Sequence, residues 1–371
     1  MTCLNHRCCS NFMGSIYYIL ASFIIFLGGC GQKSSDKDLP IDFIKVDTTY
    51  LEAGNAVYQN AKFRISDQKK KILIQHSTQL YLYDFDVDSL VRAIDLDTLD
   101  IVFPQGNLGG ALYSDSDSSY TLFFPQKKKV FHLDSDFNQL KELDLSGINE
   151  VNHVFLPFGE VFYYNPERRA YFIGMMRGDN GDIVDFLEDT RFIGIFDAES
   201  GKLKSQFSGF SDDRKATKLN ALSEGLFYVD EYEDGFLVRD VIGTQTIYNW
   251  DFEGNLVDKY NIGTGRTAME IQPYGNEDLF GSKRSDSFYG LKSVDNQLII
   301  SNLFLREYLE DTSRIDGLLL IEDIVSGKSF SKEMYAFHKI VHADDSTIWM
   351  VRNHPSIEDM ILLKINYRLE K

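Results

Sequence analysis

The chain has 371 residues, and its 56 Asp and Glu outnumber its 38 Lys and Arg, giving a net charge of −18 at pH 7. Such an acidic surface repels polyanions, which argues against nucleic acid and anionic lipid headgroups as partners. All four cysteines lie within the first thirty residues, so the later chain has no disulfide, thiolate zinc site or cysteine nucleophile.

An apolar stretch near the N-terminus, residues 16–26, is followed by Leu27, Gly28, Gly29 and Cys30. Its length suits the hydrophobic region of a signal peptide and falls short of the roughly 20 residues that a membrane-spanning helix needs. The four residues resemble the lipobox of bacterial lipoproteins. That resemblance implies cleavage after Gly29, a diacylglyceryl group on Cys30 and an amino terminus acylated by palmitate. Residues 1–29 are therefore expected to be a signal peptide, with translation starting at Met1 or Met13.

Residues 30–41 are small and polar, and they predict a flexible tether between the lipid and the folded domain. By analogy with lipoprotein sorting in Gram-negative bacteria, Gly31 after the cysteine favours the outer membrane. The Asp-Lys-Asp segment at 36–38 resembles tags that send some lipoproteins to the cell surface. We expect an extracytoplasmic protein on the periplasmic or cell-surface side of the outer membrane, with residues 42–371 as one domain.

Past the tether one unit recurs: a strand that ends in an acidic or amide residue, a short turn, and a second alternating strand. Gly and Asn in these turns supply the positive φ that tight hairpins need. A further hydrophobic strand precedes each hairpin, and residues 225–262 show four successive strands. The hairpins lie at 80–96, 130–145, 192–207, 247–262 and from 318 onward. The first strand of a sixth hairpin lies at the end of the chain, at 360–366.

Four-stranded meanders that repeat every 45–70 residues or so are typical of β-propellers. Residues 43–50 predict a strand without a hairpin, while the last strand, 361–366, has almost no chain left to pair with it. Pairing these two segments completes six blades and removes an open sheet edge. We therefore predict an all-β, six-bladed β-propeller closed by its N-terminal strand. The spacings between hairpins are uneven, and the interval from Asp251 to Asp323 is long enough to hold an insertion at 266–286. Seven blades remain the alternative.

The lipobox, the polar tether and the degenerate aromatic-rich repeats together resemble the uncharacterised lipoprotein propellers of Bacteroidota, in particular the DUF4221 family. The resemblance covers the whole chain and rests on its layout. It implies a propeller fold and a lipid-anchored exported protein. It brings no catalytic residues to this sequence.

Calcium is the first candidate chemistry. Asp84, Asp86 and Asp88 have the 1-3-5 spacing of a calcium-binding loop, and Asp95 stands at position 12, although Ser89 replaces the glycine of position 6. A similar opening follows at 134–138, but Leu145 stands where the bidentate carboxylate belongs. Acidic residues are also ordinary in hairpin turns, so we predict no cofactor, with Ca²⁺ as the alternative.

Other candidates lack partners in the sequence. His338 and His342 would share a helical face as zinc ligands, but their context predicts a strand. The chain contains no G-x-S-x-G elbow, P-loop or dinucleotide fingerprint. The remaining acidic or histidine candidates are Asp115, Asp117, residues 178–182, His153, Glu160, Asp344 and Asp345.

The sequence thus predicts a non-catalytic binding or scaffold module, anchored to a membrane by lipid, whose partner is a peptide, glycan or protein. The alternative is a propeller-type hydrolase or lyase with an active site on the axis. Fold analogy alone supports both hypotheses. Metal bound to His, Asp or Glu at the axis would favour the enzyme.

Overall fold

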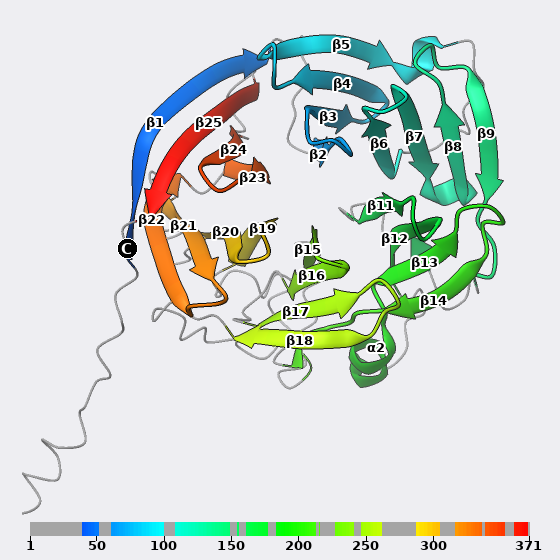
Figure 1. Ribbon diagram of the computed structural model, residues 1–371. Coiled ribbons are helices and arrows are strands. Elements are labelled where there is room, and N and C mark those ends of the chain that lie inside the picture. Colours follow the sequence, from blue (N-terminus) through cyan, green and yellow to red (C-terminus); the bar gives the residue numbers. More distant parts are fainter. Residues whose placement is uncertain are drawn as a thin grey trace, which may run out of the picture.

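The computed structural model describes residues 39–51, 61–99, 108–148, 154–155, 161–176, 183–212, 215, 227–240, 246–261, 287–304, 316–335, 338–352 and 360–369. Its strands form sheets that stand side by side around a central axis, as in a β-propeller (Figure 1). The predicted all-β class and propeller-like arrangement are therefore confirmed.

Four of the sheets are separate, and each is an antiparallel meander with its first strand innermost (Figure 1). The first holds β2 (Lys62–Ile65), β3 (Lys71–His76), β4 (Gln79–Asp84) and β5 (Ser89–Asp95). The second holds β6 (Gly110–Ser114), β7 (Ser119–Phe124), β8 (Lys129–Leu133) and β9 (Gln139–Asp144). In the third, β10 (Val154–Phe155) and β11 (Phe162–Asn165) both pair with β12 (Ala170–Met176), followed by β13 (Ile193–Asp197) and β14 (Leu203–Phe207). The fourth holds β15 (Phe227–Tyr232), β16 (Gly235–Asp240), β17 (Thr246–Asp251) and β18 (Leu256–Asn261).

The fifth sheet has eight strands and consists of two meanders joined at their outer edges. One meander is β19 (Ser287–Val294), β20 (Leu298–Phe304), β21 (Asp316–Asp323) and β22 (Lys328–Tyr335). The other is β23 (His338–Ala343), β24 (Thr347–Arg352), β25 (Met360–Leu369) and β1 (Leu39–Leu51). They join where Leu39 and Pro40 pair in parallel with Phe330 and Ser331.

Strand β1 closes the ring, as the sequence predicts. It runs antiparallel to β25 from the pair Ile41–Leu369 to the pair Leu51–Met360. The strand begins at Leu39, three residues before the predicted start of the domain at residue 42. The extra residues extend the ladder and reach the neighbouring meander.

A local hydrogen-bond pattern explains the aspartate that recurs at the end of five of the third strands. Its carboxylate accepts hydrogen bonds from backbone N–H groups of the turn that follows, which stabilises a tight hairpin. Asp134, for example, accepts from the backbone N–H groups of Asp136 and Asn138 at 2.9 and 2.8 Å. The same contact is made by Asp84, Asp197, Asp251 and Asp323.

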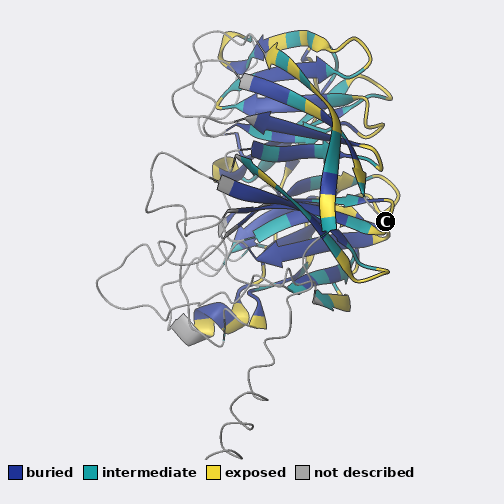
Figure 2. Cartoon of the chain, turned by 90° about the vertical axis from the view of Figure 1, so that its left-hand side faces the viewer, coloured by how far each residue is buried: buried dark blue, intermediate teal, exposed yellow. Residues whose placement is uncertain are grey.

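The turns between first and second strands and between third and fourth strands lie on one side of the ring, which we call the turn face. They include residues 66–70, 85–88, 115–118 and 134–138. Figure 2 shows these exposed turns along one edge of the molecule and buried strands between the two faces. One short helix, α2 (Ile183–Asp189), lies on the other side; the sequence pattern did not predict it. Within the described ranges, no helix is long and apolar enough to cross a membrane.

Aromatic and aliphatic side chains fill the space between neighbouring sheets. Phe123 stacks on Phe162 across the second and third sheets, with ring centroids 5.3 Å apart, and Phe172 meets Phe236 across the third and fourth at 4.8 Å. These rings pack between sheets, as the sequence predicts for its many aromatic residues. The predicted insertion at 266–286 lies outside the described residues.

Candidate functional site

Charged side chains from the innermost strands of several sheets gather near the turn face. Asp230 on β15 forms an ion pair with Lys292 on β19, with Oδ1 and Nζ 2.7 Å apart. Its other oxygen accepts from the backbone N–H and the hydroxyl of Ser293 at 2.8 and 3.1 Å. These contacts tie the fourth sheet to the fifth at their inner edges.

Residues from the opposite part of the ring reach the same place. Arg64 on β2 lies over the ring of Tyr163 on β11, 5.3 Å from its centroid. The hydroxyl of Tyr163 donates to the carbonyl of Val229 on β15 at 2.9 Å. Side chains of the first and third sheets therefore meet the backbone of the fourth sheet at the axis.

Glu231 follows Asp230 on β15 and is exposed, although protein atoms surround its carboxyl group. The pKa of Glu231 is raised, first by desolvation and then by the negative charge of Asp230. The positive charges of Lys292, Lys69 and Arg64 act in the opposite direction. We call Arg64, Lys69, Asp230, Glu231, Lys292 and His342 the axial cluster.

His342 on β23 completes the cluster. Its ring lies 5.0 Å from that of Trp349 and 5.8 Å from that of Phe85, which belongs to the first sheet. Burial, followed by the positive charges of Lys292 and Lys69, lowers the pKa of His342 to about 4. The imidazole is therefore neutral near pH 7.

Replacing His342 by phenylalanine should flatten the dependence of stability on pH. Above pH 6.5 the histidine is neutral in both states. As the pH falls from 6.5 to about 4, the unfolded chain takes up the proton first, so this histidine costs the folded state up to about 3 kcal/mol. Below pH 4 the cost is constant. Urea unfolding of both proteins at pH 7 and pH 4.5 measures the difference, and equal losses in the two proteins would contradict this assignment.

Within the described residues, the axial cluster contains charged side chains that form no ion pair. The side chains of Lys69 and Glu231 have no hydrogen bond or ion pair with another residue in the described part of the chain. Arg64 makes no ion pair there either, donating only to the carbonyl of Phe63 at 3.3 Å. Because Asp230 neutralises Lys292, the remaining charge favours an anionic group beside Lys69 and Arg64.

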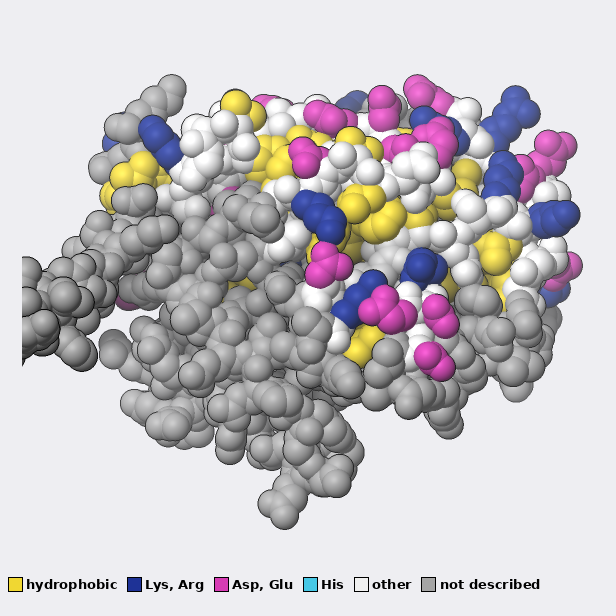
Figure 3. All heavy atoms as spheres, turned by 90° about the horizontal axis from the view of Figure 1, so that it is seen from below, with side chains coloured by type: hydrophobic (Ala, Val, Ile, Leu, Met, Phe, Trp, Pro, Cys, Tyr) yellow, Lys and Arg dark blue, Asp and Glu magenta, His cyan; other side chains and the backbone are white. Residues whose placement is uncertain are grey.

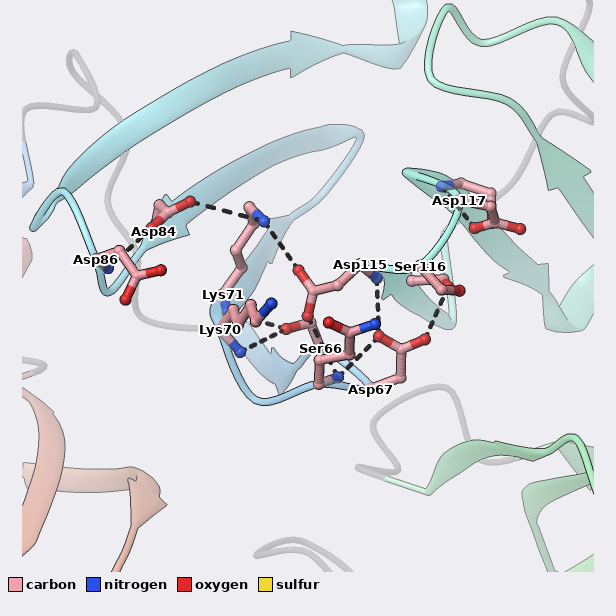
Figure 4. Close-up of polar contacts among 12 residues, drawn as sticks. Ser66, Asp67, Lys70, Lys71, Asp84, Asp86, Asp115, Ser116 and Asp117 are labelled. Atoms are coloured by element: carbon pink, nitrogen blue, oxygen red, sulfur yellow. Dashed lines mark hydrogen bonds and ion pairs between the residues drawn. The ribbon is translucent and has the colours of Figure 1, made fainter.

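The candidate calcium ligands lie elsewhere: Asp84 ends β4, and Asp86 and Asp88 belong to the turn that follows it (Figure 4). The ammonium of Lys71 lies 2.9 Å from Asp115 and 3.6 Å from Asp84, so a cation of the protein already stands between these carboxylates. Asp88 points to the hydroxyl of Tyr83 instead. Among the residues that the structure describes, no three His, Asp or Glu side chains are placed to hold a metal ion.

The same network links two turns of the turn face (Figure 4). Asp67 accepts from the backbone N–H of Asp115 and from the hydroxyl of Ser114, both at 2.8 Å. Burial alone would raise the pKa of Asp115, but contacts with Ser66 and Lys71 outweigh it and lower the pKa. The arrangement is that of a structural link between sheets.

The remaining candidates fall into three groups. Some cap turns: Asp95 accepts from the backbone N–H of Asp97, Asp117 from that of Ser119, and Asp344 from that of Thr347. His338 and His342 lie on a strand, as expected, and His338 is buried. Outside the described residues are Leu27, Gly28, Gly29, Cys30, His153, Glu160 and 178–182.

Most residues of the axial cluster were not predicted from the sequence. Its members come from β2, β15, β19, β23 and one turn, so no local motif unites them. The only signal was charge on inner strands that are otherwise largely apolar, such as Asp230 and Glu231 beside the buried Val229.

Comparisons with known proteins support the fold. The chain matches no protein-family model and no curated protein. Its structure is similar to that of a DUF4221-family protein from Bacteroides vulgatus, with a TM-score of 0.62 and 9% identity over 90% of this chain and 99% of that one. A candidate exported protein from Bacteroides fragilis matches with a TM-score of 0.51 and 10% identity, again over 90% and 99%. The expected resemblance to DUF4221 proteins is thereby confirmed for the fold.

Proposed function

We propose that the protein is a lipid-anchored, extracytoplasmic six-bladed β-propeller that binds its partner at the axial cluster without bond chemistry. The blade count treats the eight-stranded sheet as two blades, since each of its meanders has four strands like the other sheets. The export is supported by the lipobox-like residues that end in Cys30 and by the description of the Bacteroides fragilis neighbour. Outer-membrane anchoring rests on Gly31 after the cysteine.

Two cations support the binding role. Arg64 lies over Tyr163 of the third sheet, and the charges of Arg64 and Lys69 both act on Glu231 of the fourth sheet, while neither cation forms an ion pair within the described residues. A carboxylate on the partner would satisfy both. Glu231 and the neutral imidazole of His342 add hydrogen-bonding groups beside them. Among peptides, glycans and proteins, these groups fit best an acidic peptide segment or a glycan with uronic acid residues.

Binding should depend on the cluster cations. The mature chain with Cys30→Ser is titrated against acidic peptides and uronic acid oligosaccharides by calorimetry, and hits are repeated with K69Q and R64Q. We expect at least tenfold weaker binding, about the 1.4 kcal/mol that one charged hydrogen bond contributes. K259Q is the control, because Lys259 pairs with Asp212 at the outer rim. Unchanged affinity in both cluster variants would contradict the proposed site.

An active site on the axis is the second candidate. The raised pKa of Glu231 near a neutral histidine suits acid–base catalysis. Elemental analysis and product analysis of the same titrations separate the two functions. Stoichiometric zinc or calcium, or conversion of a bound oligosaccharide that E231Q abolishes, would favour the enzyme.

A further inference from the structure

Exposed apolar side chains concentrate on one part of the outer rim. Ten large hydrophobic residues are exposed in the described part of the chain. Five of them belong to β1, to β5 and to the turn 85–88 that connects β4 with β5. On β1, Val46 and Tyr50 are 49% and 62% exposed and lie on the same side of the strand, while Ile44 is 63% exposed at a bulge. The other two are Val87 and Val91.

These two strands are neighbours at the rim. The hydroxyl of Thr49 on β1 lies 3.5 Å from the carboxylate of Asp88, in the turn that leads into β5. Figure 1 shows the end of β1 beside the start of β5 on the outside of the ring. We call Ile44, Val46, Tyr50, Val87 and Val91 the apolar rim.

Strand β1 is also an edge strand along most of its length. It pairs with β22 only at Leu39 and Pro40, so from Ile41 onward its outer edge has no strand partner among the described residues. Such an edge with apolar side chains invites association unless something covers it. The position of the rim therefore suggests what lies against it.

The predicted lipid tether leads directly into this strand. Cys30 and Leu39 are nine residues apart, a length of chain that spans at most about 30 Å. An anchored bilayer is thus within reach of the apolar rim. Among the described outer strands, β1 is separated from Cys30 by the fewest residues.

The turn face is the other surface near the start of β1, but its charge is unfavourable. Its turns carry carboxylates in every sheet, and Figure 3 shows Asp and Glu side chains, with Lys and Arg among them, along the upper edge of the view. Negative charge is repelled from a bilayer with anionic lipids. Exposed carboxylates on turns away from β1 include Asp67, Asp117, Asp136 and Glu199.

We propose that the apolar rim lies against the membrane, so that the propeller stands edge-on with its axis parallel to the bilayer surface. This rests on the proposed lipid anchor. It leaves the turn face and the axial cluster open to solvent, where a soluble partner can reach them.

Single labels on the lipidated protein test the orientation. The chain past residue 30 has no cysteine, so V46C accepts one environment-sensitive fluorophore. L140C and V257C are matched controls, since both residues are apolar, exposed at 64% and 61%, and lie on outer strands of other sheets. In phosphatidylcholine vesicles with spin-labelled lipid, we expect the V46C label to be quenched at least threefold more than either control.

A C30S version of each protein separates the two hypotheses. If the parent protein floats with vesicles and the C30S version does not, the anchor is present. Equal quenching at positions 46, 140 and 257 in the floating proteins would then overturn the edge-on orientation and leave the anchor intact. If the parent fails to float, the proposed anchor itself is wrong. A label at Tyr50 (Y50C) repeats the measurement should V46C fold poorly.

Discussion

Replacement of Arg239 by alanine should lower the free energy of unfolding by about 3–5 kcal/mol, because it leaves the buried carboxylate of Glu322 without its partner. Both side chains are fully buried between the fourth and fifth sheets. Nη2 of Arg239 lies 2.8 and 3.2 Å from the two carboxylate oxygens, and Nη1 donates to Ser301 at 2.8 Å. The guanidinium also lies 3.9 Å from the ring centre of Phe288.

The Arg239–Glu322 ion pair fixes how the two sheets pack and contributes little net free energy to folding. Moving two charges out of water costs nearly as much as their attraction returns, so apolar residues of similar size should serve about equally well. We therefore expect R239M/E322L to unfold within about 1 kcal/mol of the parent in urea, while each single variant is far weaker. A single R239A variant as stable as the parent would contradict this reading.

Removal of β1 should abolish the folded monomer. The strand contributes ten residue pairs with β25 and the fully buried side chain of Ile41. Without it, the edge of β25 and the apolar residues beside it are open to other chains. The loss is expected to be on the order of 5 kcal/mol or more, which approaches the whole stability of a typical domain.

The matched pair of proteins differs only in this strand. A chain that starts at residue 39 should elute as a monomer and unfold cooperatively, whereas one that starts at residue 52 should aggregate or elute as oligomers. Size-exclusion chromatography and circular dichroism check both. A stable monomer without β1 would show that the ring does not need it.

The fold could be predicted because the residues that form most hairpins are close together in the sequence. A third strand that ends in aspartate, such as Asp134 or Asp251, supplies the oxygen that caps the next turn, and this pattern is visible in the sequence. The closure could be predicted by counting, since residues 43–50 had no partner except the last strand. The short helix α2 lacks a periodic apolar signal, and so it was missed.

The candidate site could not be predicted because its residues are distant from one another in the sequence. Lys69 and Glu231 are far apart in the chain, and the charge of Lys69 acts on Glu231 only because the sheets close around an axis. Arg239 and Glu322, 83 residues apart, likewise become partners only through the packing of two sheets. Sequence spacing instead favoured Asp84, Asp86 and Asp88. In the structure the carboxylate of Asp84 contacts Lys71 and accepts from the backbone N–H of Asp86, and that of Asp88 accepts from the hydroxyl of Tyr83.

A designed disulfide tests the closure of the ring most directly. Asp47 on β1 and Lys364 on β25 are paired, and directly opposed residues have Cα atoms about 4.5–5.5 Å apart, within reach of a disulfide. Under mild oxidation, D47C/K364C in a C30S background should form an intramolecular cross-link. The control D47C/R368C should not, because Arg368 pairs with Asp42. Cross-linking of the control to the same extent, or none in the paired variant, would contradict a ring closed by β1.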